Sequence, residues 1–339
     1  MVAKAPYTVG TRGSALAMTQ SKMAADSVAE AGGFELGMVT VKTEGDVLTG
    51  PLSQMGGTGV FAATLRTRLL EGAVDLAVHS LKDLPSAPCP GLVIGATPER
   101  EDPRDALCAR DGLTLDTLPL GARVGTGSPR RAAQLLALRP DLTVVDIRGN
   151  VGTRLARVTG NEAYGVGGAG LHGEKKLGAI TGDCDAVILA ASGLKRLSLE
   201  ETITEYLPTD RVVPAPGQGS LALEVREGEL GGEPTPLGAA VTAVDHLPTR
   251  LAVTAERALL RRLEAGCAAP IGAYAYIKDD QLTLDICVAA TNGSETLRQS
   301  LTTDQLTLEA AAALGVRAAE QLLEQGAASL AGLETAFGN

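Results

Sequence analysis

Arginine at the starts of predicted helices is the pattern that most directly suggests chemistry in this sequence. In residues 125–131 (GTGSPRR) a predicted strand ends, Ser128 is a suitable N-cap and a proline takes the first helical position. Arg130 and Arg131 then fall in the first turn, where the helix dipole favours acidic side chains. Two basic residues in this locally unfavourable position predict that an anion binds there.

The same arrangement recurs at two other predicted junctions between a strand and a helix. Arg12 precedes Ser14, the N-cap of one helix, and Arg148 precedes a helix that carries Arg154 in its first turn. Loops that follow parallel strands gather at one edge of the sheet, so we expect these five arginines to converge on one cleft. Guanidinium groups bind carboxylate or phosphate through paired hydrogen bonds, which favours a small polyanion as ligand. The alternative is five independent surface arginines.

A carboxylate follows the strand predicted at 74–79. Asp83 comes directly after Lys82, and Pro85 fixes the exit of the chain. At the mouth of an arginine-lined cleft the carboxylate remains ionised, and it can stabilise a cation that forms on a substrate and accept its proton. The alternative is that Lys82 and Asp83 form a solvated turn pair. Strand alternation turns His79 inward, so we expect a hydrogen-bonded core residue there.

The five cysteines are an odd number without CxxC spacing. Reduced thiols fit this count better than a disulfide framework or a zinc site, and three scattered histidines add no support for a metal. Cys267 lies just beyond the C-terminus of a predicted helix, where the dipole disfavours a thiolate. Residue-level reasoning therefore favours an inert thiol at Cys267.

The amino-acid composition limits the classes of protein to which this chain can belong. The 339 residues suffice for two or three domains, with 45% hydrophobic and 21% charged residues, which predicts a folded chain. The net charge of −10 argues against general nucleic-acid binding. No apolar run approaches the roughly 20 residues that span a bilayer, and no signal peptide is visible. We therefore expect a soluble, cytoplasmic protein with no membrane or nucleic-acid partner.

Short apolar runs alternate with helical patterns over the first two hundred residues. Strands are predicted at 7–9, 38–41, 74–79, 92–96, 123–125, 142–147 and 186–190, and helices from near residues 15, 61, 129 and 151. This alternation predicts parallel sheets covered by helices on both faces. After residue 235 a helix at 254–265, a hairpin at 273–277 and 282–289, and a helix at 308–325 predict a small α+β domain.

The Gly-rich stretch 159–183 is predicted to be a long exposed loop. Its sequence GVGGAG at 165–170 matches the letter pattern G-x-G-x-x-G of dinucleotide-binding loops. It neither follows a predicted strand nor opens a predicted helix, so we assign it no nucleotide site.

Seven segments together resemble the hydroxymethylbilane synthase family, also called the porphobilinogen deaminase family. In the family's order they are GTRGS at 10–14, TEGD at 43–46, AVHSLKDLP at 77–85, GTGSPRR at 125–131, IRGNVGTRL at 147–155, VPAPGQG at 213–219 and GCAAPIG at 266–272. The resemblance covers most of the chain.

The resemblance implies a transferase of tetrapyrrole and heme biosynthesis. It condenses four porphobilinogen molecules head to tail, releasing ammonia from each, into linear hydroxymethylbilane. It implies a dipyrromethane cofactor joined by a thioether to Cys267, which replaces the expectation of an inert thiol, and no metal. Asp83 matches the family's catalytic aspartate, which stabilises cationic pyrrole intermediates and moves protons. The partners implied are porphobilinogen and the growing polypyrrole chain, and we expect a monomer.

The resemblance also assigns binding residues by position. Phe61 matches an aromatic residue thought to lie over the incoming pyrrole. Residues that match the binding of cofactor and substrate carboxylates, or secondary contacts to them, are Arg12, Ser14, Ser80, Lys82, Thr126, Ser128, Arg130, Arg131, Arg148, Gly149, Arg154, Arg196, Gln218 and Gly219.

The implied fold has two doubly wound α/β domains like those of periplasmic binding proteins, followed by the α+β domain. Domain 1 comprises residues 1–103 and 213–236 and carries the catalytic aspartate. Domain 2, residues 104–212, is the arginine-rich lobe, and domain 3, residues 237–339, carries the attachment cysteine.

The sequence departs from the family at two places. Many relatives have lysines before Phe61, where this chain reads QMGGT at 54–58, so the role of that loop is in doubt. The 159–183 loop is longer than usual, and we favour a surface insertion over a cover for the cleft. Two alternative functions are a non-catalytic anion-binding protein of the same architecture and a pyrrole-binding protein without turnover.

Overall fold

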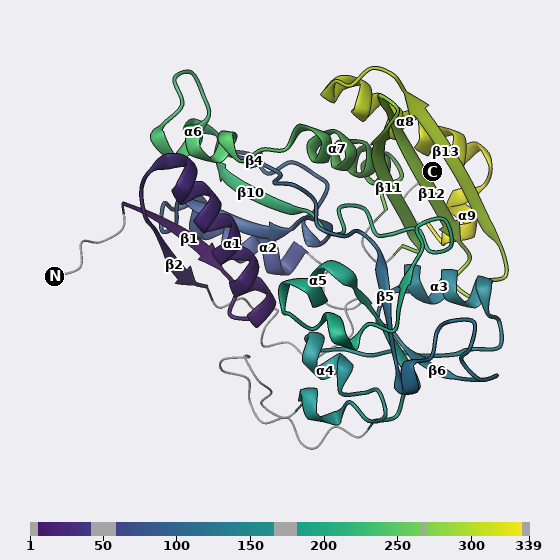
Figure 1. Cartoon of the computed structure of the whole chain (residues 1–339). Coiled ribbons are helices and arrows are strands. Elements are labelled where there is room, and N and C mark those ends of the chain that lie inside the picture. The colour runs from purple at the N-terminus through teal and green to yellow at the C-terminus, as the bar shows by residue number, and fades with distance from the viewer. Residues whose placement is uncertain (1–5, 42–58, 166–181, 266–268, 334–339) are drawn as a thin grey trace.

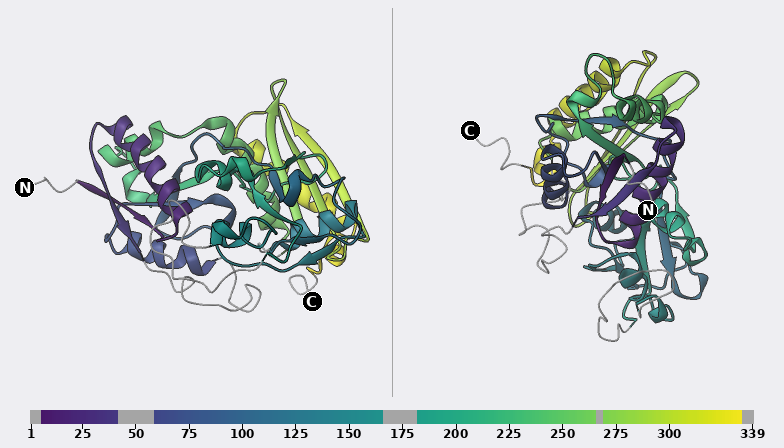
Figure 2. Two further views of the ribbon diagram at one scale, coloured as in Figure 1. Left: turned by 60° about the horizontal axis from the view of Figure 1, so that its bottom comes forward. Right: turned by 90° about the vertical axis from the view of Figure 1, so that its left-hand side faces the viewer.

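The structure is a computed structural model that describes residues 6–41, 59–165, 182–265 and 269–333. Within these residues the chain forms two five-stranded α/β sheets and one three-stranded antiparallel sheet. The first sheet (purple and blue) and the C-terminal sheet (yellow and green) lie at opposite ends of the molecule (Figures 1 and 2). The predicted class, two α/β domains followed by an α+β domain, is confirmed.

The first sheet has the strand order β2-β1-β3-β10-β4. Its helices α1 and α6 share an apolar core on one face, and α2 packs on the other. The elements are β1 (Tyr7–Thr11), α1 (Ala15–Gly32), β2 (Leu36–Thr40), α2 (Gly59–Leu70), β3 (Leu76–Ser80), β4 (Leu92–Ala96), β10 (Leu221–Arg226) and α6 (Pro236–Ala243).

The second sheet has the strand order β7-β6-β8-β5-β9. Its strands β8 and β5 are buried almost throughout, as strands covered on both faces should be. The elements are β5 (Asp105–Ala109), β6 (Arg123–Gly125), α3 (Pro129–Leu138), β7 (Thr143–Val145), α4 (Val151–Leu155), β8 (Ala186–Ala190), α5 (Ala191–Arg196) and β9 (Glu205–Leu207).

Both α/β sheets are mixed, which corrects the prediction of purely parallel sheets. β1 pairs in parallel with β2 and β3, and β6 with β7 and β8, but β10 and β5 run antiparallel to both of their neighbours. Each antiparallel strand follows a segment that crosses from the other sheet, residues 97–104 before β5 and residues 208–220 before β10. The direction of these strands is therefore set by a long-range crossing, which local periodicity does not encode.

The C-terminal sheet is the antiparallel meander β11 (Ile271–Lys278), β12 (Gln281–Ala289) and β13 (Thr296–Thr303). Its core is shared with α7 (Leu247–Arg262), α8 (Leu308–Glu324) and α9 (Ala327–Ala331). The predicted hairpin is confirmed, with Asp279 and Asp280 at positive φ in its two-residue turn. The sequence prediction missed β13 and placed the start of α7 seven residues too late, at 254 instead of 247.

Candidate functional site

The predicted site residues lie where strands of the two α/β sheets end. Arg12 follows β1, and Lys82 and Asp83 form the 3-10 turn Leu81–Asp83 after the neighbouring strand β3. In the second sheet, Ser128 follows β6 and Arg148 follows β7. Because β1 pairs with β3 and β6 with β7, each pair of loops meets at one edge of its sheet.

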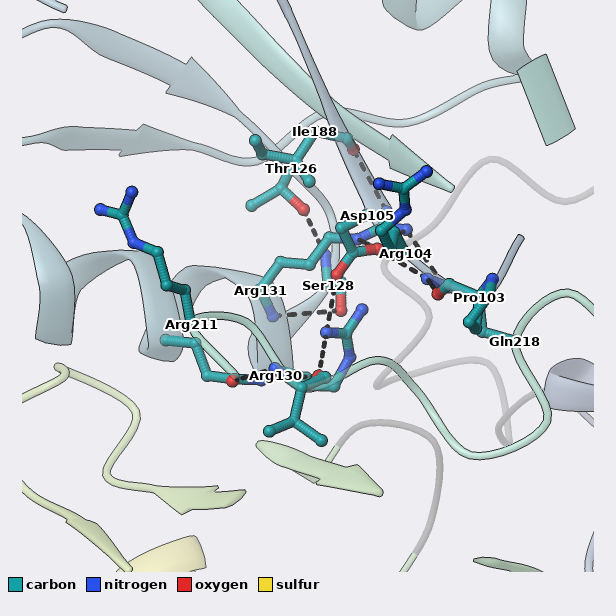
Figure 3. Close-up of polar contacts among 12 residues, drawn as sticks. Pro103, Arg104, Asp105, Thr126, Ser128, Arg130, Arg131, Ile188, Arg211 and Gln218 are labelled. Carbon is teal, nitrogen blue, oxygen red and sulfur yellow. Dashed lines mark hydrogen bonds and ion pairs between the residues drawn. The ribbon is translucent and has the colours of Figure 1, made fainter. Parts of the chain in front are cut away.

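Arg130 and Arg131 do not point outward but surround Asp105, the first residue of β5 (Figure 3). Arg130 Nη1 lies 2.8 Å from Asp105 Oδ2, and Arg131 Nη2 lies 2.8 Å from Asp105 Oδ1. The Arg130 and Arg131 residues are 3% and 6% exposed, and Asp105 is completely buried. Burial alone would raise the pKa of Asp105, but the two guanidinium charges outweigh it and hold that pKa far below its usual range.

Gln218 joins this buried group to the turn that carries Asp83. Its Nε2 donates to Asp105 Oδ1 and to the carbonyl of Pro103, each at 2.8 Å. Its Oε1 accepts from Arg131 Nη2 and from Lys82 Nζ, each at 3.3 Å. Gln218 is fully buried in one of the two segments that cross from sheet to sheet, and it bonds to Pro103 of the other. It therefore acts as a bridge within the protein, with its donors and its acceptor occupied.

Lys82, Arg148 and Arg154 form the outward-facing cationic part of the site, beside the exposed Asp83. Burial, together with the charge of Arg131, lowers the pKa of Lys82 to about 8. Burial and the charges of Arg131 and Arg148 lower the pKa of Arg154 to about 10. Asp83 acts in the opposite direction on both pKa values, as does Asp105 on that of Lys82 and Asp146 on that of Arg154. Arg131 is not a surface arginine, because it is buried against Asp105.

Within the described part of the chain, Arg148 bonds an exposed carboxylate and Arg154 a backbone carbonyl. Arg148 Nε lies 3.3 Å from a carboxylate oxygen of the exposed Asp146. Arg154 Nε donates to the carbonyl of Gly149 at 2.8 Å. Gly149 has φ +104°, and a Cβ there would lie 2.7 Å from Thr153 Cγ2, so this loop requires glycine.

The serines of the site have local partners. Ser14 Oγ accepts from the Ala17 amide at 3.3 Å and Ser128 Oγ from the Arg131 amide at 3.4 Å, so the predicted N-caps of α1 and α3 are confirmed. Ser80 Oγ donates to Gln20 Oε1 at 2.9 Å. These bonds position the helix starts.

Two further matched positions meet at the crossing segments. Arg196 Nη2 donates to the carbonyl of Gly219 at 2.7 Å. Gly219 has φ +89°, and a Cβ there would lie 2.3 Å from the carbonyl oxygen of Glu101. Thr126 is buried and its Oγ1 accepts from the Ser128 amide at 3.2 Å, which shapes the loop before α3.

Several predictions concern residues outside the described part of the chain. Cys267 lies in the segment 266–268, between α7 and β11, and the loop at 54–58 and most of the 159–183 stretch are also outside it. Phe61 is in α2, but its side chain is not described. The predictions for these residues therefore stay predictions.

Sequence reasoning missed Asp105, because nothing local distinguishes it from a surface aspartate in the sequence EDPRDA at 101–106. The burial expected of His79 is confirmed: the residue is 8% exposed. Its Nε2 lies 3.2 Å from Glu224 Oε2, which also accepts from Arg66 Nε. The described residues include no cluster of potential metal ligands, and no described helix is long and apolar enough to span a bilayer.

The arrangement fits a ligand that carries several carboxylates. Among the described residues, burial and, after it, the charges of neighbouring guanidinium groups lower the pKa values of Lys82 and Arg154, so the cations of the site repel one another. Bound carboxylates would relieve that repulsion and supply acceptors for the guanidinium groups. A cofactor or substrate that bears acetate and propionate groups satisfies this requirement.

Two family models match the chain. "Porphobilinogen deaminase, dipyromethane cofactor binding domain" matches residues 7–231, and "Porphobilinogen deaminase, C-terminal domain" matches residues 250–324. Among curated proteins named porphobilinogen deaminase, that of Micrococcus luteus is 51% identical over 96% of this chain and 95% of its own length. The porphobilinogen deaminase of Cutibacterium acnes is 52% identical over 96% of this chain and 97% of its own length.

Solved structures with a similar trace include an ABC transporter periplasmic substrate-binding protein from Coxiella burnetii. It is 14% identical, covers 70% of this chain and 91% of its own, and has a TM-score of 0.41. The methionine-binding protein MetQ is 12% identical, covers 70% and 89%, and has a TM-score of 0.37. Likeness at this level carries no functional argument.

The fold defines a protein with two mixed α/β sheets and a C-terminal antiparallel sheet with helices, and the family models specify it further. The chain belongs to the porphobilinogen deaminase family, which acts in tetrapyrrole synthesis, and it has that family's dipyrromethane cofactor-binding domain.

Proposed function

We propose that the chain joins four porphobilinogen molecules head to tail into hydroxymethylbilane, with Asp83 as the catalytic group. The observation that carries this proposal is the position of the exposed Asp83 carboxylate beside the cations Lys82, Arg131 and Arg154. As ammonia leaves porphobilinogen, positive charge develops on its pyrrole ring. The Asp83 carboxylate stabilises that charge and takes up the proton released when the new carbon–carbon bond forms.

The outward-facing cations bind the acetate and propionate groups of the ligand. Arg148 and Arg154 are suited to this because their protein partners are an exposed carboxylate and a backbone carbonyl. Lys82, with a pKa of about 8, is mostly charged at neutral pH and gains further charge when a carboxylate binds beside it. The same proposed binding region includes Arg12, Ser14, Ser80, Phe61, Arg196 and Gly219.

A group of residues beneath the binding surface supports the site: Arg130, Arg131, Thr126, Ser128 and Gln218. Their bonds to Asp105, to each other and to backbone carbonyls fix the loop before α3 and hold Lys82 next to Asp83. The buried ion pairs keep a fixed positive potential beneath the site while leaving the outer arginines for the ligand.

The dipyrromethane cofactor is attached through a thioether to Cys267 in this proposal, and when bound it supplies the primer that is extended. In the sequence, Cys267 comes five residues after Arg262, the last residue of α7. We further propose that residues 1–103 with 213–236, residues 104–212 and residues 237–339 form the three domains, and that the enzyme is a cytoplasmic monomer.

Substitution of Asp83 by Asn tests the proposed catalytic role. The Asp83→Asn variant, loaded with cofactor, is expected to bind porphobilinogen but to lose turnover by at least about 100-fold, because an amide neither stabilises the cation nor accepts the proton. Asp26→Asn, which removes an exposed carboxylate of α1 paired with Lys22, is the control and keeps turnover.

Near-normal turnover of Asp83→Asn with intact cofactor would remove Asp83 from the mechanism. A parent protein that binds porphobilinogen without releasing ammonia would favour the non-catalytic alternative. Ammonia release and a mass measurement of bound pyrrole units distinguish these outcomes.

A further inference from the structure

Helix α7 of the C-terminal region holds the backbone that directly follows Asp83. Arg257 Nη1 donates to the carbonyl of Leu84 at 2.9 Å, and Arg257 Nη2 donates to the carbonyl of Pro85 at 2.6 Å. One helical turn later, Arg261 Nη2 donates to the carbonyl of Ser86 at 2.7 Å. Three successive carbonyls after the catalytic turn are thus bound by two guanidinium groups on one face of α7.

The remaining contacts of the turn come from the α/β part of the chain. The Leu81 amide donates to the Ser220 carbonyl at 3.0 Å, and Lys82 Nζ donates to Gln218 Oε1. On the same side, a Cβ at Gly217 would lie 3.1 Å from the Lys82 amide nitrogen, so the crossing segment packs directly against the turn. These contacts fix the start of the turn and the Lys82 side chain. Helix α7 holds the backbone that follows the turn.

Apolar contacts also join α7 to the turn, since Leu81, Leu84 and Val253 lie in one buried cluster. A partly open cavity of about 140 Å³ lies beside this cluster, lined among others by Leu81, Arg257 and Arg261. The apolar contacts hold the leucine side chains of the turn, and the hydrogen bonds of Arg257 and Arg261 hold the backbone carbonyls that follow it.

We propose that Arg257 is a positioning residue for Asp83, which fixes the exit of the catalytic turn by binding two successive carbonyls with one guanidinium fork. This inference rests on the catalytic role proposed for Asp83. The planar fork suits two neighbouring acceptors, whereas a lysine ammonium matches that pair less well.

The test compares kcat and KM of the full-length holoenzyme for Arg257→Leu, Arg257→Lys and the matched control Arg298→Leu. Arg298, on β13, also binds two successive carbonyls, those of Asp210 and Arg211 at 2.5 and 2.6 Å, but these lie in the segment before β10. Misplacement of a reacting group by about 1 Å can lower a rate about 100-fold.

We expect Arg257→Leu to lower kcat by about 10- to 100-fold with KM changed less than about twofold. Arg257→Lys should recover part of kcat, and Arg298→Leu should keep kcat within about twofold of the parent. Cofactor content is measured by mass for each variant, so that a loss of attachment is recognised. If Arg257→Leu does not fold, the kcat of Arg257→Lys against Arg298→Lys decides the same question.

A kcat of the Arg257 variant equal to that of the Arg298 variant, or a parallel loss in both, would overturn the proposal. The Asp83→Asn variant separates this failure from that of the proposed function. If Asp83→Asn loses turnover while Arg257→Leu keeps it, only the positioning role is wrong. If Asp83→Asn keeps turnover, the catalytic role is wrong, and the positioning proposal fails with it.

Discussion

The second α/β sheet carries arginines at the starts of two helices, and the two groups meet different partners. At the start of α3, Arg130 and Arg131 turn inward to the buried Asp105. Around α4, Arg148 and Arg154 remain at the outer part of the site, where Arg154 has a lowered pKa. Both groups occupy the same sequence context, a strand end followed by a capped helix.

The difference teaches that an unfavourable basic residue at a helix start has two explanations. Either the fold supplies a buried carboxylate, as Asp105 does for α3, or the charge is left for a ligand, as for α4. The first kind of arginine contributes mainly to stability and to the arrangement of neighbouring groups. The second kind contributes mainly to ligand capture, and substitutions separate the two.

Removal of Asp105 is expected to have the largest effect. Asp105→Ala leaves two buried guanidinium groups without their carboxylate, which costs about 3–5 kcal/mol of unfolding free energy. Urea unfolding measures this loss, and Asp26→Ala on the surface of α1 should change the free energy by less than about 0.5 kcal/mol. A loss of similar size in both variants would show that the Asp105 cluster is not a main source of stability.

Removal of Arg154 is expected to affect ligand capture rather than folding. Arg154→Leu loses a charged contact to a ligand carboxylate, worth about 1.5–3 kcal/mol, so KM for porphobilinogen should rise by about 10- to 100-fold. Unfolding free energy should fall much less than in Asp105→Ala. If KM is unchanged while stability falls, Arg154 belongs with the inward-facing group.

Substitution of an N-cap serine tests whether the serines of the site bind the ligand. Ser128→Ala should lower the unfolding free energy by about 1 kcal/mol through the lost N-cap of α3, and should leave KM within about twofold. Urea unfolding and steady-state kinetics on the same preparation give both values. A tenfold rise in KM would instead assign Ser128 a direct contact with the ligand.

The smallest expected effect is the pH dependence of KM for porphobilinogen, which tests Lys82 in the outward-facing group. Burial and Arg131 lower the pKa of Lys82 to about 8, so its ammonium loses charge as the pH rises through 8. Porphobilinogen carboxylates stay ionised there, so KM should increase a few-fold between pH 7 and pH 9. Lys82→Gln should lack this increase. An identical profile in both proteins would exclude Lys82 as its source.

Local patterns predicted much of the architecture. The apolar strand β8, the capped helices α1 and α3, and the β11–β12 hairpin each follow from signals within a few residues. The strands β5 and β10 were missed or misoriented because they pair only after the chain has crossed between sheets. Such long-range pairing leaves no periodic signal in the sequence.

The composition of the site was predictable, but the direction of its side chains was not. Arg131 and Arg154 follow the same pattern, and nothing near either one reveals that Asp105 faces the former. Gln218 was predicted at the site, but its fourfold hydrogen bonding depends on three distant segments. Partner choice in the interior is a tertiary property.

Denaturing mass spectrometry of the active protein tests the central claim most directly, namely that the cationic site serves a pyrrole primer anchored at Cys267. The account predicts a mass above that of the 34.6 kDa chain by two porphobilinogen units minus two ammonia molecules, and loss of this increment in Cys267→Ser. An unmodified mass in a preparation that produces hydroxymethylbilane would contradict it.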